Sequence, residues 1–152
     1  MKNYLFLSVS FLIFICSSNS YAEGKWTFFN YDEYCVIQTN PIKTEIPEGK
    51  IRGDHGLIVY RIHKSSEIVV QITPGFNYKS INSIEVKIDD ESYNFYTDTD
   101  VAFTKEDKKI IYAMKKGLEL ITSGISTSGT KVIDTYTLKG FTSAVNKLSN
   151  DC

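Results

Sequence analysis

Short strand-like runs, each ended by turn residues, recur along most of this 152-residue chain and constrain its fold more than any other feature. In residues 84–89 apolar and charged side chains alternate, which is the pattern of a strand with one face in the core and one in solvent. The turn Asp89-Asp90-Glu91 predicts a hairpin, and the Ser/Thr/Gly segment 125–129 predicts a second one. The strand-like runs are KWTFFNY, EYCVIQT, HGLIVYRIH, EIVVQIT, SIEVKID, SYNFYTD, LELITSG and TKVIDTYTL.

Two segments lack this strand-like pattern and are predicted to be helices. Thr104 and Asp107 resemble a capping box with a shortened acid, and the following run ends at Gly117, a residue that commonly stops a helix. Near the C-terminus, apolar residues within 141–148 recur at i, i+3, i+4 and i+7, which places them on one helical stripe. A helix this short is marginal alone in water, so we expect its stripe to pack against the domain.

The N-terminus has the features of an export signal. An almost unbroken apolar run, Tyr4–Cys16, follows a weakly basic start, and Ser20-Tyr21-Ala22 offers small residues at the two positions that a signal peptidase recognises. We therefore expect residues 1–22 to be a signal peptide that is cleaved before Glu23. A membrane anchor is the alternative, but a spanning helix needs about 20 apolar residues. Acylation of Cys16 is a further alternative, although bulky residues precede that cysteine.

The remaining residues, 23–152, are enough for one domain with its own core, and no linker or internal repeat divides them. Their elements predict a mostly β fold, an immunoglobulin-like β-sandwich with two short helices, one before the last hairpin and one at the C-terminus. A small closed barrel is the alternative.

Charge and composition limit the partners. Lys2 leaves with the signal, so 16 of the 17 basic side chains remain against 18 acidic ones, a net charge of −2. The charges are interspersed, which argues against a nucleic-acid partner and against a polybasic membrane-surface protein. We expect a periplasmic or outer-envelope monomer that is not inserted stably in a membrane after cleavage.

Cysteine counting predicts a crosslink. Once Cys16 is removed with the signal, Cys35 and Cys152 are the two that remain. Two cysteines in an exported domain most often form one disulfide, which here would fasten the C-terminal tail to an early strand. A free thiol pair and an intermolecular bridge are the alternatives.

Catalytic and metal-binding motifs are missing from the sequence. It contains no G-x-S-x-G, H-E-x-x-H, C-x-x-C or P-loop pattern. His55 and His63 lie near the two ends of one strand-like run, roughly 27 Å apart if it is extended, so they cannot share a metal ion and are expected to be ordinary surface residues. Asp98, Asp100 and the acidic turn at 89–91 offer oxygen ligands for calcium, but solvated turns are favoured. We expect no cofactor, no metal ion and no catalytic residue.

Aromatic residues make up 13% of the chain and gather near the mature start, at 26–34, and in the centre of the chain, and most of them are expected to fill the core. The turn segment 74–80 is the exception, because it places Phe76 and Tyr78 where aromatic rings can anchor a protein or glycan partner. Inward packing of the two rings is the favoured alternative.

The mature chain resembles the invasion-associated locus B family over essentially its whole length. The resemblance is carried by Trp26 near the mature start and by four segments, of which the last is the most specific. These segments are YCVIQTNPIK, SIEVKIDDESYNFYTD, VAFTKEDKKIIYAMKKG and GTKVIDTYTLKGFTSAVNKL. Thr137 occupies a position that is serine in the family's most specific motif, and the further cysteine pair of larger members is missing here.

The resemblance implies an exported β-sandwich protein of Gram-negative bacteria, without assigned catalytic residues or cofactor. It also implies a link to host-cell invasion in animal-associated relatives. We therefore expect a non-catalytic binding or structural module whose partner is an unknown envelope or host protein, or a glycan. The alternative is a small periplasmic hydrolase with an unrecognised carboxylate site, which would need a pocket with convergent carboxyl groups.

Overall fold

Ten antiparallel strands form one continuous sheet in the computed structural model, which describes residues 24–79 and 83–152. Their order across the sheet is β1-β2-β4-β5-β8-β7-β6-β9-β10-β3. The strands are β1 (Thr27–Asn30), β2 (Tyr34–Thr39), β3 (Lys43–Glu45), β4 (Gly56–Ile62), β5 (Ile68–Thr73), β6 (Ser83–Ile88), β7 (Glu91–Asp98), β8 (Val101–Phe103), β9 (Glu119–Ile125) and β10 (Lys131–Thr137). The predicted signal peptide lies outside the described residues.

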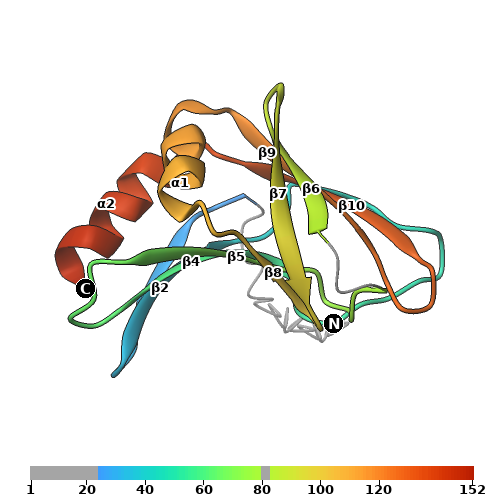
Figure 1. The fold of residues 1–152 in the computed structure, drawn as a ribbon, viewed down its shortest axis with the longest axis horizontal. Coiled ribbons are helices and arrows are strands. Elements are labelled where there is room, and N and C mark those ends of the chain that lie inside the picture. The colour runs from blue at the N-terminus through green and yellow to red at the C-terminus, as the bar shows by residue number, and fades with distance from the viewer. Residues whose placement is uncertain (1–23, 80–82) are drawn as a thin grey trace, which may run out of the picture.

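The sheet is strongly curled, and β6, β7, β9 and β10 run across the direction of β2, β4 and β5 (Figure 1). Buried residues from both parts, such as Leu57 and Phe95, belong to one hydrophobic cluster. The predicted mostly β, sandwich-like architecture with two short helices is therefore confirmed, with the difference that two parts of a single sheet provide the two layers.

One segment joins the two ends of this sheet. The chain leaves β2 through Asn40, Pro41 and Ile42 and continues as β3, and while β2 pairs with β1 and β4, β3 pairs with β10. The amide of Ile42 donates to the carbonyl of Thr135 at 2.8 Å within this crossing. The curled sheet thus shares a feature of the barrel alternative, because one stretch of chain runs from β2, next to one edge strand, to β3, the other edge strand.

The two predicted hairpins are confirmed. β6 pairs with β7 from Ile88 and Glu91 outward, so Asp89 and Asp90 form the turn, and β9 pairs with β10 from Ile125 and Lys131 outward. Asp89 has a positive φ of 51°, and its carboxylate accepts hydrogen bonds from the backbone amides at the start of β9. This acidic turn therefore connects two parts of the sheet.

Two helices occur in the described part of the chain, at the predicted places: α1 (Asp107–Lys116) before the last hairpin and α2 (Phe141–Asp151) at the C-terminus. The predicted capping box is wrong, because neither side chain caps the helix. Thr104 accepts a hydrogen bond from the amide of Glu106, whereas the Asp107 carboxylate accepts one at 2.8 Å from the amide of Val70 in β5. Asp107 therefore ties α1 to the sheet.

The apolar stripe of α2 is buried as predicted. Phe141, Val145 and Leu148 are at most 1% exposed and belong to the core cluster. Helix α2 contacts β1, β2 and β4 and lies beside this part of the sheet (Figure 1). Helix α1 contacts β5 and packs beside α2. Among the described residues, no helix is long and apolar enough to cross a bilayer.

Candidate functional site

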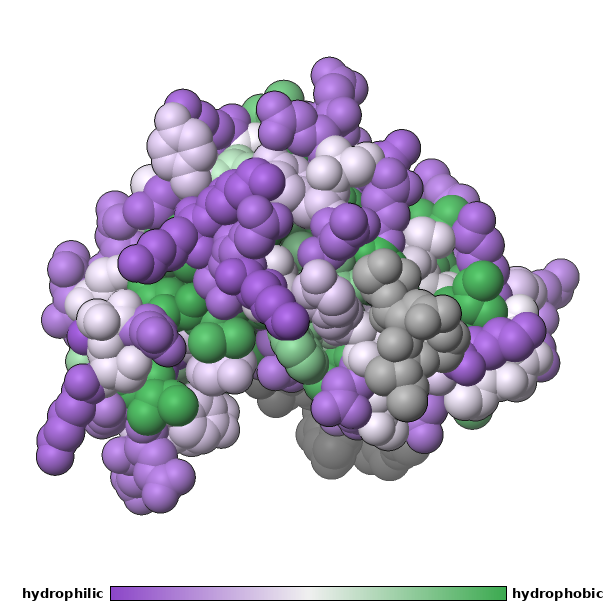
Figure 2. All heavy atoms as spheres, in the orientation of Figure 1, coloured by the Kyte–Doolittle hydropathy of each residue, from purple (hydrophilic) through white to green (hydrophobic). Residues whose placement is uncertain are grey.

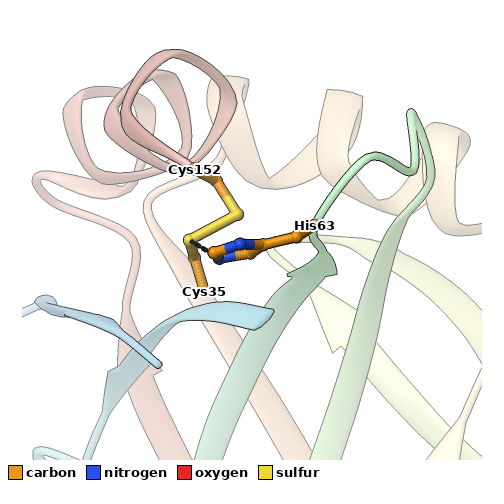
Figure 3. Close-up of side chains that lie close together, drawn as sticks. All are labelled: Cys35, His63 and Cys152. Atoms are coloured by element: carbon orange, nitrogen blue, oxygen red, sulfur yellow. Dashed lines mark hydrogen bonds between the residues drawn. A yellow bond between two sulfur atoms is a disulfide. The ribbon is translucent and has the colours of Figure 1, made fainter. Parts of the chain in front are cut away.

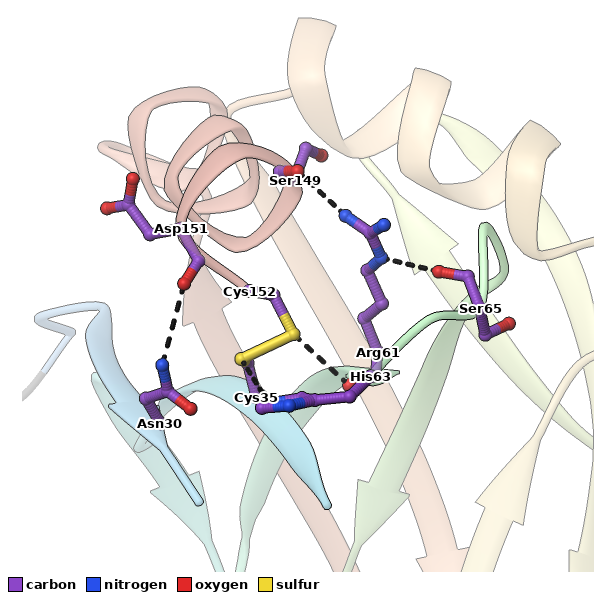
Figure 4. The surroundings of a disulfide bond; sticks show 8 residues. All are labelled: Asn30, Cys35, Arg61, His63, Ser65, Ser149, Asp151 and Cys152. Atoms are coloured by element: carbon purple, nitrogen blue, oxygen red, sulfur yellow. Dashed lines mark hydrogen bonds between the residues drawn. A yellow bond between two sulfur atoms is a disulfide. The ribbon is translucent and has the colours of Figure 1, made fainter. Parts of the chain in front are cut away.

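The C-terminal tail is fastened to the sheet by the predicted disulfide between Cys35 and Cys152, whose Cα atoms lie 5.6 Å apart (Figure 4). Cys35 is fully buried on β2, and Cys152 follows α2 directly and is half-buried. The end of α2 has two further attachments. Arg61 donates to the carbonyl of Ser149 at 2.7 Å, and Asn30 donates to the carbonyl of Asp151 at 3.5 Å.

His63 lies beside this disulfide, with its Nε2 3.3 Å from the Sγ of Cys35 (Figure 3). The expectation that His63 is an ordinary surface residue is therefore wrong. The reason is the register of β2 and β4, in which Cys35 pairs with Arg61. His63 follows two residues later and points to the same side of the sheet, because side chains alternate with a period of two. The amide of His63 donates to the carbonyl of Glu33, which fixes its backbone.

His55 lies near the other end of β4, so the two histidines are separated by the strand, as the sequence predicts. Its Nδ1 is 3.0 Å from the carbonyl oxygen of Gly53. His55 therefore takes part in the conformation of its own loop.

Phe76 and Tyr78, the predicted anchors, pack on each other with ring centroids 5.5 Å apart. Tyr78 is only 8% exposed and Phe76 is half-buried against the core. Both rings lie on the backbone of Gly124 in β9, where a Cβ would come within 2.9 Å of Tyr78 and 3.2 Å of Phe76. The rings thus have the inward packing that was the favoured alternative, and a role in partner binding stays a prediction.

Two carboxyl groups, buried Asp134 and half-buried Asp107, are engaged by other residues of the fold. Asp134, 3% exposed, forms a bidentate ion pair with Arg52 and accepts a hydrogen bond from Thr44. Burial raises the pKa of Asp107, an effect that the hydrogen bond from the amide of Val70 partly opposes. Asp98 accepts a hydrogen bond from Thr99 in the turn before β8. These carboxyl groups are held at separate places and do not converge.

Sequence reasoning missed an aromatic surface on the outer side of β1, β2 and β4. Cys35 and Ile37 point into the core, so Tyr34, Val36 and Gln38 of the same strand point outward. By the same alternation, β4 buries Leu57 and Val59 and turns its even-numbered residues outward. Helix α2 covers the inner side of these strands, because its buried stripe belongs to the same cluster as the inward residues.

The strand register arranges the outward residues in rows. Phe29 pairs with Val36, Val36 with Tyr60, and Tyr60 with Val69, which makes one row across four strands. Ile62 lies opposite Tyr34 in the neighbouring row.

The ring of Tyr31, in the loop between β1 and β2, extends this surface. Tyr31 lies between Phe29, on which it stacks, and Tyr34, with centroid distances of 6.2 Å and 5.1 Å.

These side chains border an open groove of about 470 Å³, which we name the outer-face groove. Its lining residues are Tyr31, Glu33, Tyr34, Val36, Gln38, Ile58, Tyr60, Ile62 and Gln71. Three of its apolar residues are strongly exposed, namely Tyr31 at 48%, Tyr34 at 41% and Ile62 at 57%. Tyr31 and Tyr34 are therefore exceptions to the expectation that most aromatic residues fill the core. On the face viewed in Figure 2, by contrast, hydrophobic residues form small patches between hydrophilic ones.

A polar groove of about 630 Å³ continues from the outer-face groove. The two grooves share Gln38 and Ile58, and the second is also lined by Asn40, Asp54 and His55. The outer side of this layer therefore combines an aromatic end with a polar end, an arrangement suited to recognising a partner that is itself partly apolar and partly polar.

The chain is similar to proteins of one family, both in sequence and in structure. A family model described as "Invasion associated locus B (IalB) protein" matches residues 15–149. Among solved structures, the chain is similar to the crystal structure of invasion associated protein B from Bartonella henselae, with a TM-score of 0.58 and 14% sequence identity. That match covers 83% of this chain and 92% of the Bartonella chain. No curated protein matches the chain in a search by sequence.

Proposed function

This chain belongs to the invasion associated locus B family, and from this premise we propose that it is an exported cell-envelope protein that acts by binding a partner and has no catalytic centre. The apolar run Tyr4–Cys16 and the small residues before Glu23 support export to the periplasm or outer envelope. The name of the similar Bartonella protein supports host-cell invasion as one setting for this role. General maintenance of the envelope is the other.

The outer-face groove is the observation that carries the proposal. Exposed aromatic and aliphatic side chains that are contiguous over several strands mark interaction surfaces in soluble proteins. Tyrosine is among the residues that contribute most to binding energy, because its ring buries a large area at a small cost in conformational entropy. A monomer gains nothing from exposing Tyr31, Tyr34 and Ile62 together, so we assign the partner to this surface.

The chemistry of the groove favours a protein partner, with a glycan as the second candidate. Its rim combines tyrosine rings with the carboxylate of Glu33, as in protein interfaces that have an apolar centre and a polar border. The amide side chains of Gln38 and Gln71 line the same groove, and amides can donate to and accept from sugar hydroxyls, which supports the glycan candidate.

The competing hydrolase requires carboxyl groups that converge on one pocket. Asp134 is neutralised by Arg52, and Asp107 binds a backbone amide of β5. These assignments favour a structural role for both carboxyl groups and make the binding module the better supported proposal.

A paired-variant capture experiment tests the proposal. The mature wild-type protein and the double variant Tyr34→Ser/Ile62→Ser are each used as bait in cross-linked envelope extract and on immobilised envelope polysaccharide. A matched control, Tyr112→Ser/Leu118→Ser, removes a tyrosine and an aliphatic residue that are 60% and 80% exposed elsewhere. The proposal predicts a partner that the wild type and the control capture and the groove variant loses. Equal capture by all three proteins would assign the partner to another surface.

Export is tested separately by N-terminal sequencing of the native protein, which should begin at Glu23. A chain that begins at Met1, or one acylated on Cys16, would contradict the proposed export route. Size-exclusion chromatography with light scattering, over a range of concentrations, tests whether the protein is a monomer.

A further inference from the structure

The disulfide and His63 bring three potential metal ligands to one place, although they come from three separate parts of the chain. The ligand atoms of Cys35, His63 and Cys152 all lie within 4.8 Å of one another (Figure 3). From this arrangement we infer that the reduced form of the Cys35–Cys152 pair, together with Nε2 of His63, is a binding site for a thiophilic divalent cation of the zinc class.

The distances suit a tetrahedral zinc site. With Zn–S bonds of about 2.3 Å and Zn–N bonds of about 2.0 Å, the sulfur and nitrogen ligands lie about 3.5 Å apart and two sulfurs about 3.8 Å apart. The Sγ of Cys35 and Nε2 of His63 are already separated by 3.3 Å. The two sulfurs must move apart once their bond is broken, and Cys152 can supply this movement because it lies beyond the last residue of α2.

The two ligands on the sheet are held in place by the backbone. Cys35 lies within β2 and is paired with Arg61 of β4, and the amide of His63 is bound by the carbonyl of Glu33. Lys64, which follows His63 in the chain, is exposed. The guanidinium of Arg61 is directed toward the carbonyls of Ser65 and Ser149, as Figure 4 shows. Two preorganised ligands and one adjustable ligand make a site that needs little rearrangement to accept a cation.

Reduction must come before binding, because disulfide sulfurs are poor metal ligands and thiolates are good ones. A dithiol reductant supplies the two electrons. One of its thiolates attacks the half-buried sulfur of Cys152, the sulfur of the fully buried Cys35 leaves as a thiolate, and the second thiol of the reductant resolves the mixed disulfide. The Cys35–Cys152 bond is broken, a disulfide is formed in the reductant, and the cation then displaces the remaining thiol proton.

Three protein ligands leave a fourth position for water or for a group from a partner. The tail of the domain thus has two alternative fastenings, a disulfide under oxidising conditions and a metal ion under reducing ones. In both, the end of α2 stays attached to β2.

Co²⁺ is the probe for this site, because thiolate ligation gives it a near-ultraviolet charge-transfer band and tetrahedral geometry gives it intense visible bands. The mature protein is reduced with dithiothreitol, freed of the reductant without oxygen, and titrated with Co²⁺ and then with Zn²⁺ as competitor. We expect both bands at one Co²⁺ per chain, and their loss when Zn²⁺ is added. The oxidised protein should give neither band.

Three variants identify the ligands. Cys152→Ser should abolish the charge-transfer band of the pair, and His63→Gln should weaken binding at least about tenfold. His55→Gln, a histidine variant at the other end of β4, should bind as the wild type does. Near-ultraviolet circular dichroism shows whether each reduced protein retains its fold.

The inference is overturned if the reduced, folded protein gives no charge-transfer band, or if His63→Gln binds as tightly as the wild type. Binding by the oxidised protein with the same bands would also overturn it, because the metal would then lie elsewhere. A reduced chain that lacks native circular dichroism both with and without metal would exclude the site as well.

Discussion

Arg52 and Asp134 form a buried, bidentate ion pair that fixes an irregular loop against the last strand. Nη1 of Arg52 lies 2.6 Å from one carboxylate oxygen of Asp134, and Nη2 lies 2.7 Å from the other. The two side chains are only 6% and 4% exposed. Arg52 also donates to the carbonyl of Pro74 and to the hydroxyl of Thr44, so its charge is well solvated by the fold.

Removing one partner of this pair should destabilise the domain strongly. Asp134→Leu or Arg52→Met leaves the opposite group without its counter-charge in the interior, which typically costs about 3–5 kcal/mol. The double variant Arg52→Met/Asp134→Leu should lose less than the sum of the two single losses, because it leaves no unpaired charge. Urea unfolding of the four proteins measures this coupling. Single losses below about 1 kcal/mol would show that the pair is not buried as described.

Unlike the paired charges of Arg52 and Asp134, the Tyr136 hydroxyl is buried without a hydrogen-bond partner among the described residues. Tyr136→Phe should therefore raise the free energy of unfolding, by about 1 kcal/mol, since an unsatisfied buried hydroxyl costs roughly 1–3 kcal/mol. Tyr93→Phe is the matched control. Its hydroxyl donates to Glu91 at 2.6 Å, so removing this hydroxyl should not raise the free energy of unfolding. A loss of stability in Tyr136→Phe would reveal a partner, such as a buried water.

The pH dependence of stability above about pH 10 provides a second comparison of the wild type with Tyr136→Phe. Burial, followed by the charge of Asp134, raises the pKa of Tyr136 above its ordinary value. A raised pKa means that the neutral phenol contributes stability fully below the unfolded pKa of about 10, and that this contribution is lost as the pH rises above it. The stability of the wild type should fall more steeply than that of Tyr136→Phe above about pH 10.

Cys152→Ser should lower the free energy of unfolding by about 2–5 kcal/mol, because the disulfide closes a loop across most of the domain. The amides of α2 should lose protection from hydrogen exchange before those of the strands, since the bond fastens the end of that helix. Mass spectrometry of the unreduced wild type provides the control. Two alkylatable thiols in purified protein would contradict the crosslink.

The sequence predicts those features of the fold that depend on neighbouring residues, and it does not predict those that depend on pairing between distant segments. The 84–98 hairpin and the stripe of α2 were predictable, because alternation and helical spacing are visible within a few residues. β3 and β8 have three residues each, too few to show alternation. β3 pairs with the distant strand β10, and β8 pairs with the distant strand β5 as well as with its neighbour β7.

The candidate sites were less predictable, because they depend on register and on which face of the sheet is covered. The contact of His63 with Cys35 follows from the pairing of Cys35 with Arg61, which no short sequence pattern indicates. The exposure of Tyr34 depends on α2 covering the opposite side of β2. If the pairing of Cys35 with Arg61 is assumed, the sequence does suggest the histidine contact. Residue 63 is two positions after residue 61, so its side chain lies on the same face of the sheet as those of residues 35 and 61.

Asp107→Asn should show how burial of a carboxyl group affects stability in acid. Because burial raises the pKa of Asp107, its protonated form contributes stability fully below the unfolded pKa of about 3.9, and this contribution is lost as the pH rises through the folded pKa. Relative to the wild type, Asp107→Asn should therefore become more stable as the pH rises from acid to neutral. In Asp107→Asn the side-chain oxygen can still accept a hydrogen bond from the backbone amide of Val70. Asp107→Ala leaves the Val70 amide unpaired and should be less stable than Asp107→Asn at every pH.

Phe76→Ala distinguishes the two roles that the sequence allows for the turn after β5. The half-buried ring packs on Tyr78 and on the backbone of Gly124, so its removal should lower the free energy of unfolding by about 2 kcal/mol, less than the loss typical of a fully buried phenylalanine. Tyr78→Ala should cost more, because that ring is almost completely buried. Thermal unfolding and partner capture are measured on the same samples, with Tyr34→Ser/Ile62→Ser as the comparison. If Phe76→Ala instead retained the wild-type melting temperature and lost the partner, Phe76 would be the anchor and the outer-face groove would not be the main contact surface.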